Sequence, residues 1–180
     1  MEAPTPSKEY DELDQKWHRV LVQEDPAEAC SDALDPANRE KNRYFNVIPL
    51  NETRVKLSDG EPGDYVNASW IKPSTAYAHK LAYISAQAPV RKAIADFWRM
   101  IWQESVFIIV MLTKTTEHGQ IKADQYWPKQ LNISERISAN LEIELQEEDN
   151  SQLEIVIRRI ILRHLGDGSE RYIDGICVSY

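Results

Sequence analysis

Cysteine is scarce in this chain of 180 residues, which contains only Cys30 and Cys177. At most one disulfide can form, so a fold held by a disulfide framework is excluded. Long apolar runs are also absent: residues 106–112 form the longest, far below the roughly 18 residues that a membrane-spanning helix needs. Residues 1–9 contain no apolar stretch after a basic start, so we expect no secretory signal. These absences favour a reducing, intracellular setting.

Positive charge is in deficit, with 21 lysines and arginines against 29 aspartates and glutamates and a net charge of −8. This balance argues against bulk binding to nucleic acid or to an anionic membrane, although a phosphate site needs only a few local donors. The 4 histidines are scattered without ligand spacing, so we expect neither a metal nor a cofactor. With 42% hydrophobic residues, the chain is long enough to bury a core as one soluble domain.

The pattern of apolar residues predicts an α/β chain (α+β) in which helices flank a mixed, twisted sheet. Residues 1–8 are small and polar, so we expect a disordered lead-in, and apolar spacing predicts a helix over residues 10–21. Residues 24–42 are interpreted as a loop with one short helix. Short strands are predicted between Tyr44 and Gln87, with a strong turn at residues 58–63.

A helix is predicted to open at Pro89, because an apolar stripe with helical spacing follows that proline. Residues 106–112 form a β-branched run, which is typical of a strand covered on both faces. Three later strands are predicted from alternating apolar residues and from a Gly-Asp-Gly hairpin turn at 166–168. They are residues 141–145, 153–162 and 172–180.

Four dense motifs carry the most specific signal. They are KNRY at residues 41–44, DYVNAS at 64–69, DFWRMIW at 96–102 and QYWP at 125–128. In this order they resemble the N-terminal part of a tyrosine-specific protein phosphatase domain. The DFWRMIW motif is the most specific, and both its composition and the resemblance assign it to packing in a core helix. The resemblance also implies scaffold roles for Arg54 and for Asn67, which would bond backbone across a turn. Ala88 stands where the family usually has glycine, which implies mild strain or a relaxed variant.

The resemblance implies that two residues shape substrate entry. Tyr44 has the position at which these phosphatases present an aromatic wall that packs on the phenyl ring of phosphotyrosine. Asn46 stands where many members carry an aspartate that holds the backbone of the substrate peptide, and its amide lacks the charge of that carboxylate. Phe45 occupies the place of basic residues that often attract acidic substrates, which departs from the family pattern.

Glu117 and Lys122 flank a polar segment that would, by its residues alone, be a charged hairpin. The resemblance implies that both support the active site. The glutamate would pair with the arginine that binds phosphate, and the lysine would approach the loop that carries the general acid. Both of those partners belong to motifs that do not occur within the 180 residues.

The catalytic groups of the family are not found in this sequence. Their chemistry needs a cysteine thiolate within His-Cys-x5-Arg and an aspartic acid within Trp-Pro-Asp. No histidine directly precedes a cysteine here, and Trp127-Pro128 is followed by Lys129. Cys30 has acidic neighbours that would disfavour a thiolate. We therefore predict no catalytic residue in this chain and no turnover by the chain alone.

We interpret residues 9–180 as a partial protein tyrosine phosphatase domain that stops short of the catalytic loops. The parent protein would hydrolyse phosphotyrosine in partner proteins, either in the cytoplasm or as the intracellular part of a receptor. The alternative is a non-catalytic, phosphatase-like module that binds partners or phosphotyrosine. An unrelated α/β scaffold would have to match four ordered motifs by chance. In a truncated domain, we expect the strand at residues 106–112 to be poorly covered and prone to aggregation.

Overall fold

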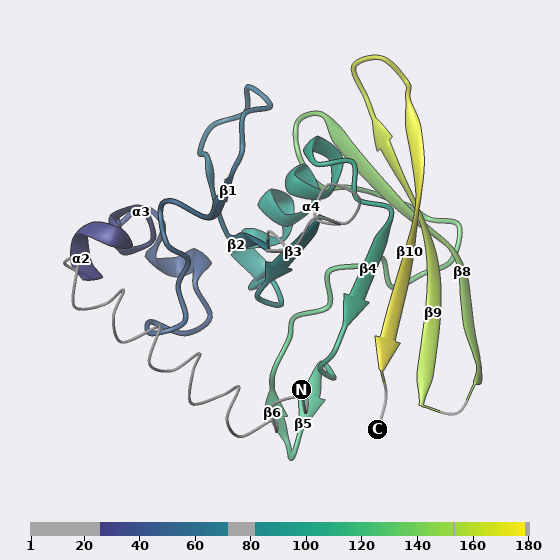
Figure 1. Ribbon diagram of the computed structural model, residues 1–180. Helices are drawn as coiled ribbons and strands as arrows, with labels where there is room; N and C mark the ends of the chain where they lie inside the picture. Colours follow the sequence, from purple (N-terminus) through teal and green to yellow (C-terminus); the bar gives the residue numbers. More distant parts are fainter. Residues whose placement is uncertain (1–25, 72–81, 153, 179–180) are drawn as a thin grey trace, which may run out of the picture.

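The computed structural model describes residues 26–71, 82–152 and 154–178, whose arrangement is shown in Figure 1. The predicted lead-in at residues 1–8 and the predicted helix over residues 10–21 lie outside the described residues. The segment predicted as loop with one short helix instead contains three short helical elements. They are α2 (Pro26–Ala29), α3 (Ser31–Leu34) and the 3-10 turn η1 (Arg39–Lys41). Pro36 separates α3 from η1, because a proline within a helix removes a backbone donor.

The first sheet is antiparallel, with strands in the order β1-β2-β3. Its strands are β1 (Arg54–Lys56), β2 (Tyr65–Ile71) and β3 (Tyr83–Ala86). The predicted turn at residues 58–63 joins β1 to β2. Gly60 and Gly63 in this turn have φ angles of 85° and 82°, a left-handed conformation that glycine adopts without strain. The side chains of Val55 on β1 and Val66 on β2 are buried in the hydrophobic core.

The second sheet is mixed, as predicted, with strands in the order β4-β10-β9-β8-β7. The strand β4 runs parallel to β10, and the other neighbours are antiparallel. The predicted Gly-Asp-Gly turn joins β9 to β10, and β10 begins two residues before the predicted start. The strands are β4 (Ile108–Met111), β7 (Ser134–Arg136), β8 (Leu141–Gln152), β9 (Ile155–His164) and β10 (Glu170–Val178). The predicted α/β fold with a mixed sheet is therefore confirmed.

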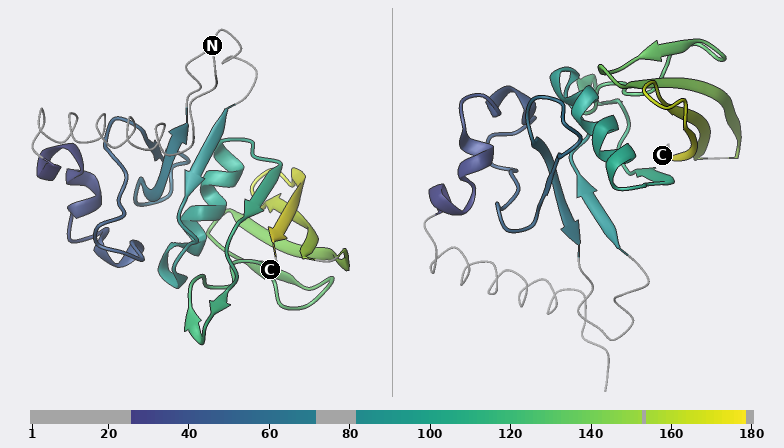
Figure 2. Two further views of the ribbon diagram at one scale, coloured as in Figure 1. Left: turned by 60° about the horizontal axis from the view of Figure 1, so that its bottom comes forward. Right: turned by 90° about the horizontal axis from the view of Figure 1, so that it is seen from above.

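Helix α4 (Ile94–Gln103) lies between the two sheets, as both views in Figure 2 show. Its side chains Phe97, Trp98 and Ile101 are buried, and they join residues of both sheets in one hydrophobic core. The prediction that the DFWRMIW motif forms a core helix is confirmed. Among the described residues, no helix is long and apolar enough to cross a membrane.

The predicted start of this helix at Pro89 is wrong. Val90 is extended, with φ −74° and ψ 158°, and the 3-10 turn η2 (Arg91–Ala93) precedes α4. The carbonyl oxygen of Pro89 accepts a hydrogen bond of 3.2 Å from the guanidinium of Arg43. The Pro89 carbonyl oxygen, which would accept the first hydrogen bond of a helix that began there, is bound instead by Arg43. Local periodicity cannot reveal such a long-range contact.

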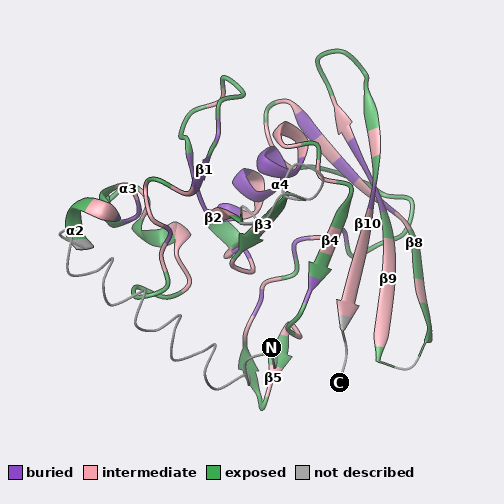
Figure 3. Ribbon diagram, in the orientation of Figure 1, coloured by how far each residue is buried: buried purple, intermediate pink, exposed green. Residues whose placement is uncertain are grey.

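The β-branched run of residues 106–112 predicted a strand covered on both faces, and this prediction is also wrong. The separate expectation that this strand would be poorly covered is confirmed. Within the described ranges, β4 pairs with β10 alone and is an edge strand of its sheet. Met111 is buried, but Ile108, Val110 and Leu112 are 59%, 56% and 75% exposed. Figure 3 shows exposed residues along β4 beside the buried core. A β-branched run indicates a strand that suits a sheet interior, but it does not reveal whether a neighbouring strand is present.

We expect Val110→Lys to reduce self-association of the chain, because a charge on an edge strand opposes pairing with another strand. The side chain is exposed, so the free energy of unfolding should change by less than about 0.5 kcal/mol. Sedimentation velocity over a range of concentrations measures the self-association. Met111→Lys, which places the charge in the core, should instead prevent cooperative folding. Equal self-association of the Val110→Lys and unchanged chains would contradict the prediction.

Candidate functional site

The KNRY segment is held to the rest of the molecule through each of its first three residues. The Lys41 ammonium lies 2.9 Å from a carboxylate oxygen of Asp96 on α4. It also donates a hydrogen bond of 3.4 Å to the carbonyl oxygen of Tyr65 on β2. The Asp96 carboxylate is buried and is shared with Arg99, at 2.8 Å. The core helix therefore positions this segment by charge as well as by packing.

Asn42 is the centre of a polar cluster between the N-terminal turns and β2. Its amide oxygen accepts hydrogen bonds from the Tyr65 hydroxyl at 2.6 Å and from the Asn67 amide at 2.9 Å. Its own amide nitrogen donates to the carbonyl oxygen of Ala33 at 3.1 Å. Burial raises the pKa of Tyr65 to about 12, so this hydroxyl remains a proton donor across the physiological pH range. Asn42 thus satisfies two buried groups of β2 at once.

The Gln87 side chain binds the backbone of the KNRY segment, and the Arg43 side chain binds residues beyond Gln87. The Gln87 amide accepts from the backbone N–H of Arg43 at 2.9 Å and donates to the carbonyl oxygen of Lys41 at 2.6 Å. The Arg43 guanidinium lies 2.7 Å from the Asp124 carboxylate and donates to the carbonyl oxygen of Ala88 at 3.3 Å. The described residues with positive φ do not include Ala88, so an alanine at this position is not strained.

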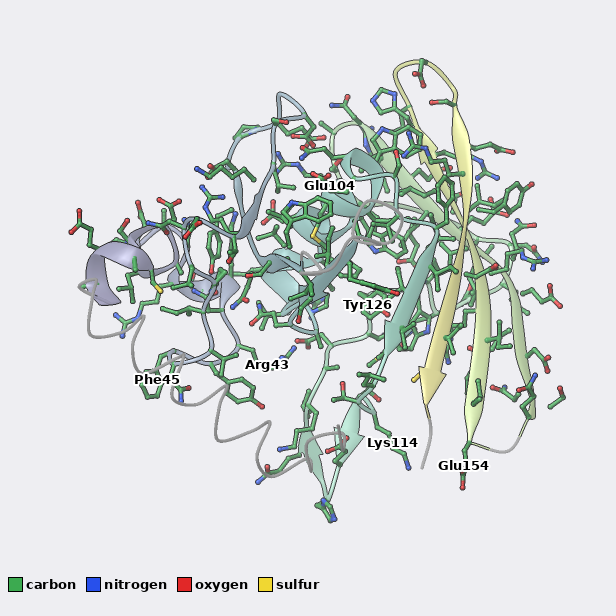
Figure 4. All side chains as sticks on the ribbon, viewed as in Figure 1. Arg43, Phe45, Glu104, Lys114, Tyr126 and Glu154 are labelled. Atoms are coloured by element: carbon green, nitrogen blue, oxygen red, sulfur yellow. The ribbon has the colours of Figure 1, made fainter. Side chains whose placement is uncertain are left out.

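Tyr44, Phe45 and Asn46 follow directly and are all exposed. The Tyr44 side chain is 49% exposed and the Phe45 side chain is 88% exposed. In Figure 4, Phe45 stands at the outer side of the molecule, farther from the sheets than Arg43. A fixed segment therefore ends in an aromatic pair that faces solvent.

The strands β5 (Thr116–Glu117) and β6 (Gln120–Ile121) form a hairpin. Glu117 is the last residue of β5, and Lys122 directly follows β6. His118 and Gly119 between these strands have φ angles of 50° and 76°, as a tight two-residue hairpin turn requires. The Glu117 carboxylate accepts from the backbone N–H of Lys114 at 3.3 Å. The Lys122 ammonium contacts the amide oxygen of Gln120 at 3.4 Å. Both contacts are at the long limit for hydrogen bonds.

The predicted site residues therefore form two groups, Tyr44 with Asn46 and Glu117 with Lys122. Arg43 directly precedes Tyr44, and Asp124 lies two residues after Lys122. The ion pair between Arg43 and Asp124 therefore connects the two groups. Sequence reasoning missed Asp124 and Gln87, whose partners are more than 40 positions away. It also missed the polar role of Asp96, although a charge inside an apolar helical stripe was a signal for it.

Two buried arginines, Arg54 of β1 and Arg99 of α4, pair with aspartates of neighbouring segments. Arg54 lies 2.6 Å from both Asp32 and Asp64 and is 6% exposed, so its predicted scaffold role is confirmed. Arg99 donates to both carboxylate oxygens of Asp59, at 2.7 and 2.5 Å. These hydrogen bonds lower the pKa of Asp59. The Asn67 amide donates to the carbonyl oxygen of Val47 at 2.9 Å, as predicted for a residue that bonds backbone across a turn.

Cys30 is buried, and its burial raises the pKa of its thiol. The thiolate is therefore disfavoured as expected, but the cause is desolvation rather than the acidic neighbours that the sequence suggested. Cys177 is half-buried on β10. In the described parts of the chain, no group of three or more histidine, cysteine, aspartate or glutamate side chains is placed to hold a metal ion.

Comparison with known proteins identifies relatives of this chain. A family model described as protein-tyrosine phosphatase matches residues 38–176. Receptor-type tyrosine-protein phosphatase alpha of Homo sapiens is 35% identical over 145 residues, which cover 79% of this chain and 17% of that protein. Receptor-type tyrosine-protein phosphatase zeta of Homo sapiens is 45% identical over 98 residues, covering 52% of this chain and 4% of that protein.

A relative outside the animals shows similar identity. Tyrosine-protein phosphatase 1 of Dictyostelium discoideum is 45% identical over 97 residues, which cover 52% of this chain and 18% of that protein. In each of these three relatives, the matched segment is less than a fifth of the full length. The similarity therefore concerns one part of larger proteins.

We expect Asn42→Ala to lower the free energy of unfolding by about 3 kcal/mol, because it leaves the Tyr65 hydroxyl and the Asn67 amide without their acceptor. Urea denaturation followed by tryptophan fluorescence measures this loss. Asn46→Ala, the same change at an exposed position four residues later, should cost less than about 0.5 kcal/mol. Equal losses for the two variants would show that the Asn42 cluster does not stabilise the fold.

The lowered pKa of Asp59 predicts a dependence of stability on pH. A carboxyl whose folded pKa lies below its unfolded value stabilises the fold above the unfolded pKa of about 3.9 and loses this contribution as the pH falls through the folded pKa. The difference in urea midpoint between the unchanged chain and Asp59→Asn should therefore be largest above pH 5 and shrink towards pH 2. Glu52→Gln, at an exposed position, is the matched control. A difference that stays constant from pH 2 to pH 6 would exclude this linkage.

Proposed function

The chain belongs to the protein-tyrosine phosphatase family, and from this premise we propose that it forms the substrate-facing part of a phosphatase unit acting on protein phosphotyrosine. The observation that carries the proposal is the arrangement of the KNRY segment. Its first three residues are anchored to α4, β2 and the Gln87 side chain, and Tyr44 follows with a half-exposed ring. A ring on a fixed backbone offers contact area at low entropic cost.

In this proposal, Tyr44 packs on the phenyl ring of phosphotyrosine, and a tall aromatic wall favours this long side chain over the shorter phosphoserine. Asn46 donates to and accepts from the backbone of the substrate peptide as a neutral amide. The exposed Phe45 beside them offers an apolar contact without charge. Tyr44 and Phe45 together form what we call the aromatic rim. Recognition at the aromatic rim therefore depends on shape and aromatic contact more than on charge.

Glu117 and Lys122 have supporting roles in the proposal. Their contacts within the hairpin are long, at 3.3 and 3.4 Å, so both side chains can take stronger partners. A glutamate here can orient a phosphate-binding arginine, and a lysine can approach an acid-bearing loop. The ion pair between Arg43 and Asp124 holds the segment after this hairpin close to the residue that precedes Tyr44.

We further propose that the 180 residues do not catalyse the reaction by themselves. Hydrolysis through a phosphocysteine intermediate needs a low-pKa thiolate, a bidentate arginine and a general acid. The sequence contains neither His-Cys-x5-Arg nor Trp-Pro-Asp. Burial raises the pKa of the Cys30 thiol, which is the wrong direction for a nucleophile. A protein that joins this unit to those groups would have the complete chemistry.

We expect the purified chain to hydrolyse p-nitrophenyl phosphate no faster than buffer does, because its sequence contains neither the motif that activates a cysteine nucleophile nor the motif that carries the general acid. A continuous absorbance assay at pH 6 to 7.5 measures this rate. Turnover that follows the protein through a further purification step, and disappears in Cys30→Ser, would refute the proposal of an inactive chain.

Substrate recognition needs a second experiment in a complete protein. Residues 38–176 would replace the matching segment of receptor-type tyrosine-protein phosphatase alpha, and Tyr44→Ala would be tested in that graft. Loss of the aromatic contact, worth about 1.4 kcal/mol, should raise KM for a phosphotyrosine peptide about tenfold while kcat changes less. Phe45→Ala is the control with the neighbouring exposed ring. A graft that binds the peptide but never hydrolyses it would instead favour the non-catalytic, phosphatase-like module.

A further inference from the structure

A recessed surface lies on a part of the chain that includes none of the predicted site residues. It is an open hollow of about 300 Å³ between η2 with the first turn of α4 on one side and residues 125–127 with β7 on the other. We call it the η2–β7 groove. Its volume is at the small end of the range for ligand sites in proteins.

The η2–β7 groove is positively charged in a chain whose net charge is −8. Its lining contains the cations Arg91, Lys92 and Arg136 and a single acid, Glu135, and Glu40 outside the lining pairs with Lys92, which leaves an excess of one positive charge. Arg91 and Lys92 are exposed on η2, and Arg136 is exposed on β7. Cations from two elements more than 40 positions apart in sequence thus meet at one hollow.

The Arg136 side chain is already oriented. Its Nε donates to the carbonyl oxygen of Ser138 at 3.1 Å and its Nη2 donates to that of Ala139 at 2.6 Å. These two bonds fix the plane of the guanidinium and leave Nη1 for another acceptor. On the opposite side, Lys92 forms an exposed ion pair with Glu40, a kind of pair that contributes little and is readily exchanged.

The floor of the η2–β7 groove is apolar. It includes Ile94, Trp127 and Ile137, all of them half-buried. The guanidinium of Arg158 lies over the Trp127 ring, 4.3 Å from its centroid, and holds the indole in place. A ligand for this surface therefore needs an apolar group for the floor and negative charge for the two sides.

We propose that the η2–β7 groove binds an acidic peptide segment that carries one aliphatic side chain between carboxylates. The aliphatic side chain packs on Trp127 and Ile137, and the carboxylates pair with Arg91 and Arg136. Two flanking cations with a small apolar floor suit a short peptide better than nucleic acid, whose phosphate backbone would approach a strongly acidic molecule. This binding does not depend on the phosphatase proposal, because none of its residues belongs to the aromatic rim or to the hairpin.

The test uses the full chain and a fluorescein-labelled peptide with two glutamates on each side of one leucine. Fluorescence anisotropy at low salt should show saturable binding that weakens as sodium chloride rises from 50 to 200 mM. Arg91→Glu should weaken binding at least fivefold, and Arg136→Glu should do the same. Lys56→Glu makes the same change of charge on β1, outside the η2–β7 groove, and should alter affinity less than twofold.

Two further measurements keep the result specific. Arg136→Glu also removes the bonds to Ser138 and Ala139, so its thermal transition is compared with that of the unchanged chain, and Arg91→Glu decides the outcome if Arg136→Glu is unfolded. A peptide with glutamines in place of glutamates should bind at least tenfold more weakly. Equal binding of the two peptides, equal affinity of Arg91→Glu, or no saturation below 1 mM would each overturn the proposal.

Discussion

The burial of helix α4 between two sheets is the constraint on which the rest of this structure depends. Trp98 is 0% exposed, and its indole N–H donates to the carbonyl oxygen of Tyr126 at 2.8 Å. The same helix brings Phe97 and Ile101 into a core that neither sheet could close alone. Replacing one large core side chain by alanine typically costs about 3 to 5 kcal/mol, so this helix carries a large part of a normal domain stability.

The polar residues of α4 extend this constraint to the surface. Asp96 is 7% exposed and receives both Lys41 and Arg99, and Arg99 in turn holds the turn at residues 58–63 through Asp59. Buried charges of this kind stabilise a fold only while every partner is present. The position of the exposed Tyr44 therefore depends on contacts that begin in the core at Asp96 and reach it through Lys41, three residues before it.

The sequence predicted those features that depend on local pattern. Alternating apolar residues located β8, β9 and β10, and the density of aromatic residues located α4. Local pattern did not predict that Pro89 lies outside the helix, and it predicted a covered strand where the structure has the edge strand β4, because both features depend on partners far away in the chain. The poor coverage of β4 was expected only from the resemblance to a longer domain. The same limit applies to the site: the KNRY motif identified where Tyr44 lies, but only the structure shows that Gln87 and Asp124 anchor the residue before it.

The residues 87–93 connect the aromatic rim with the η2–β7 groove. Gln87 and the carbonyl oxygens of Ala88 and Pro89 hold the KNRY segment, while Arg91 and Lys92, a few residues later, line the groove. The pairing of Lys92 with Glu40 of η1 links the two surfaces a second time. A ligand in the groove that competes for Lys92 would release Glu40, one residue before Lys41. This exposed pair contributes little, and the contacts of Lys41, Arg43 and Gln87 that hold the KNRY segment do not involve it, so the two surfaces can be occupied together.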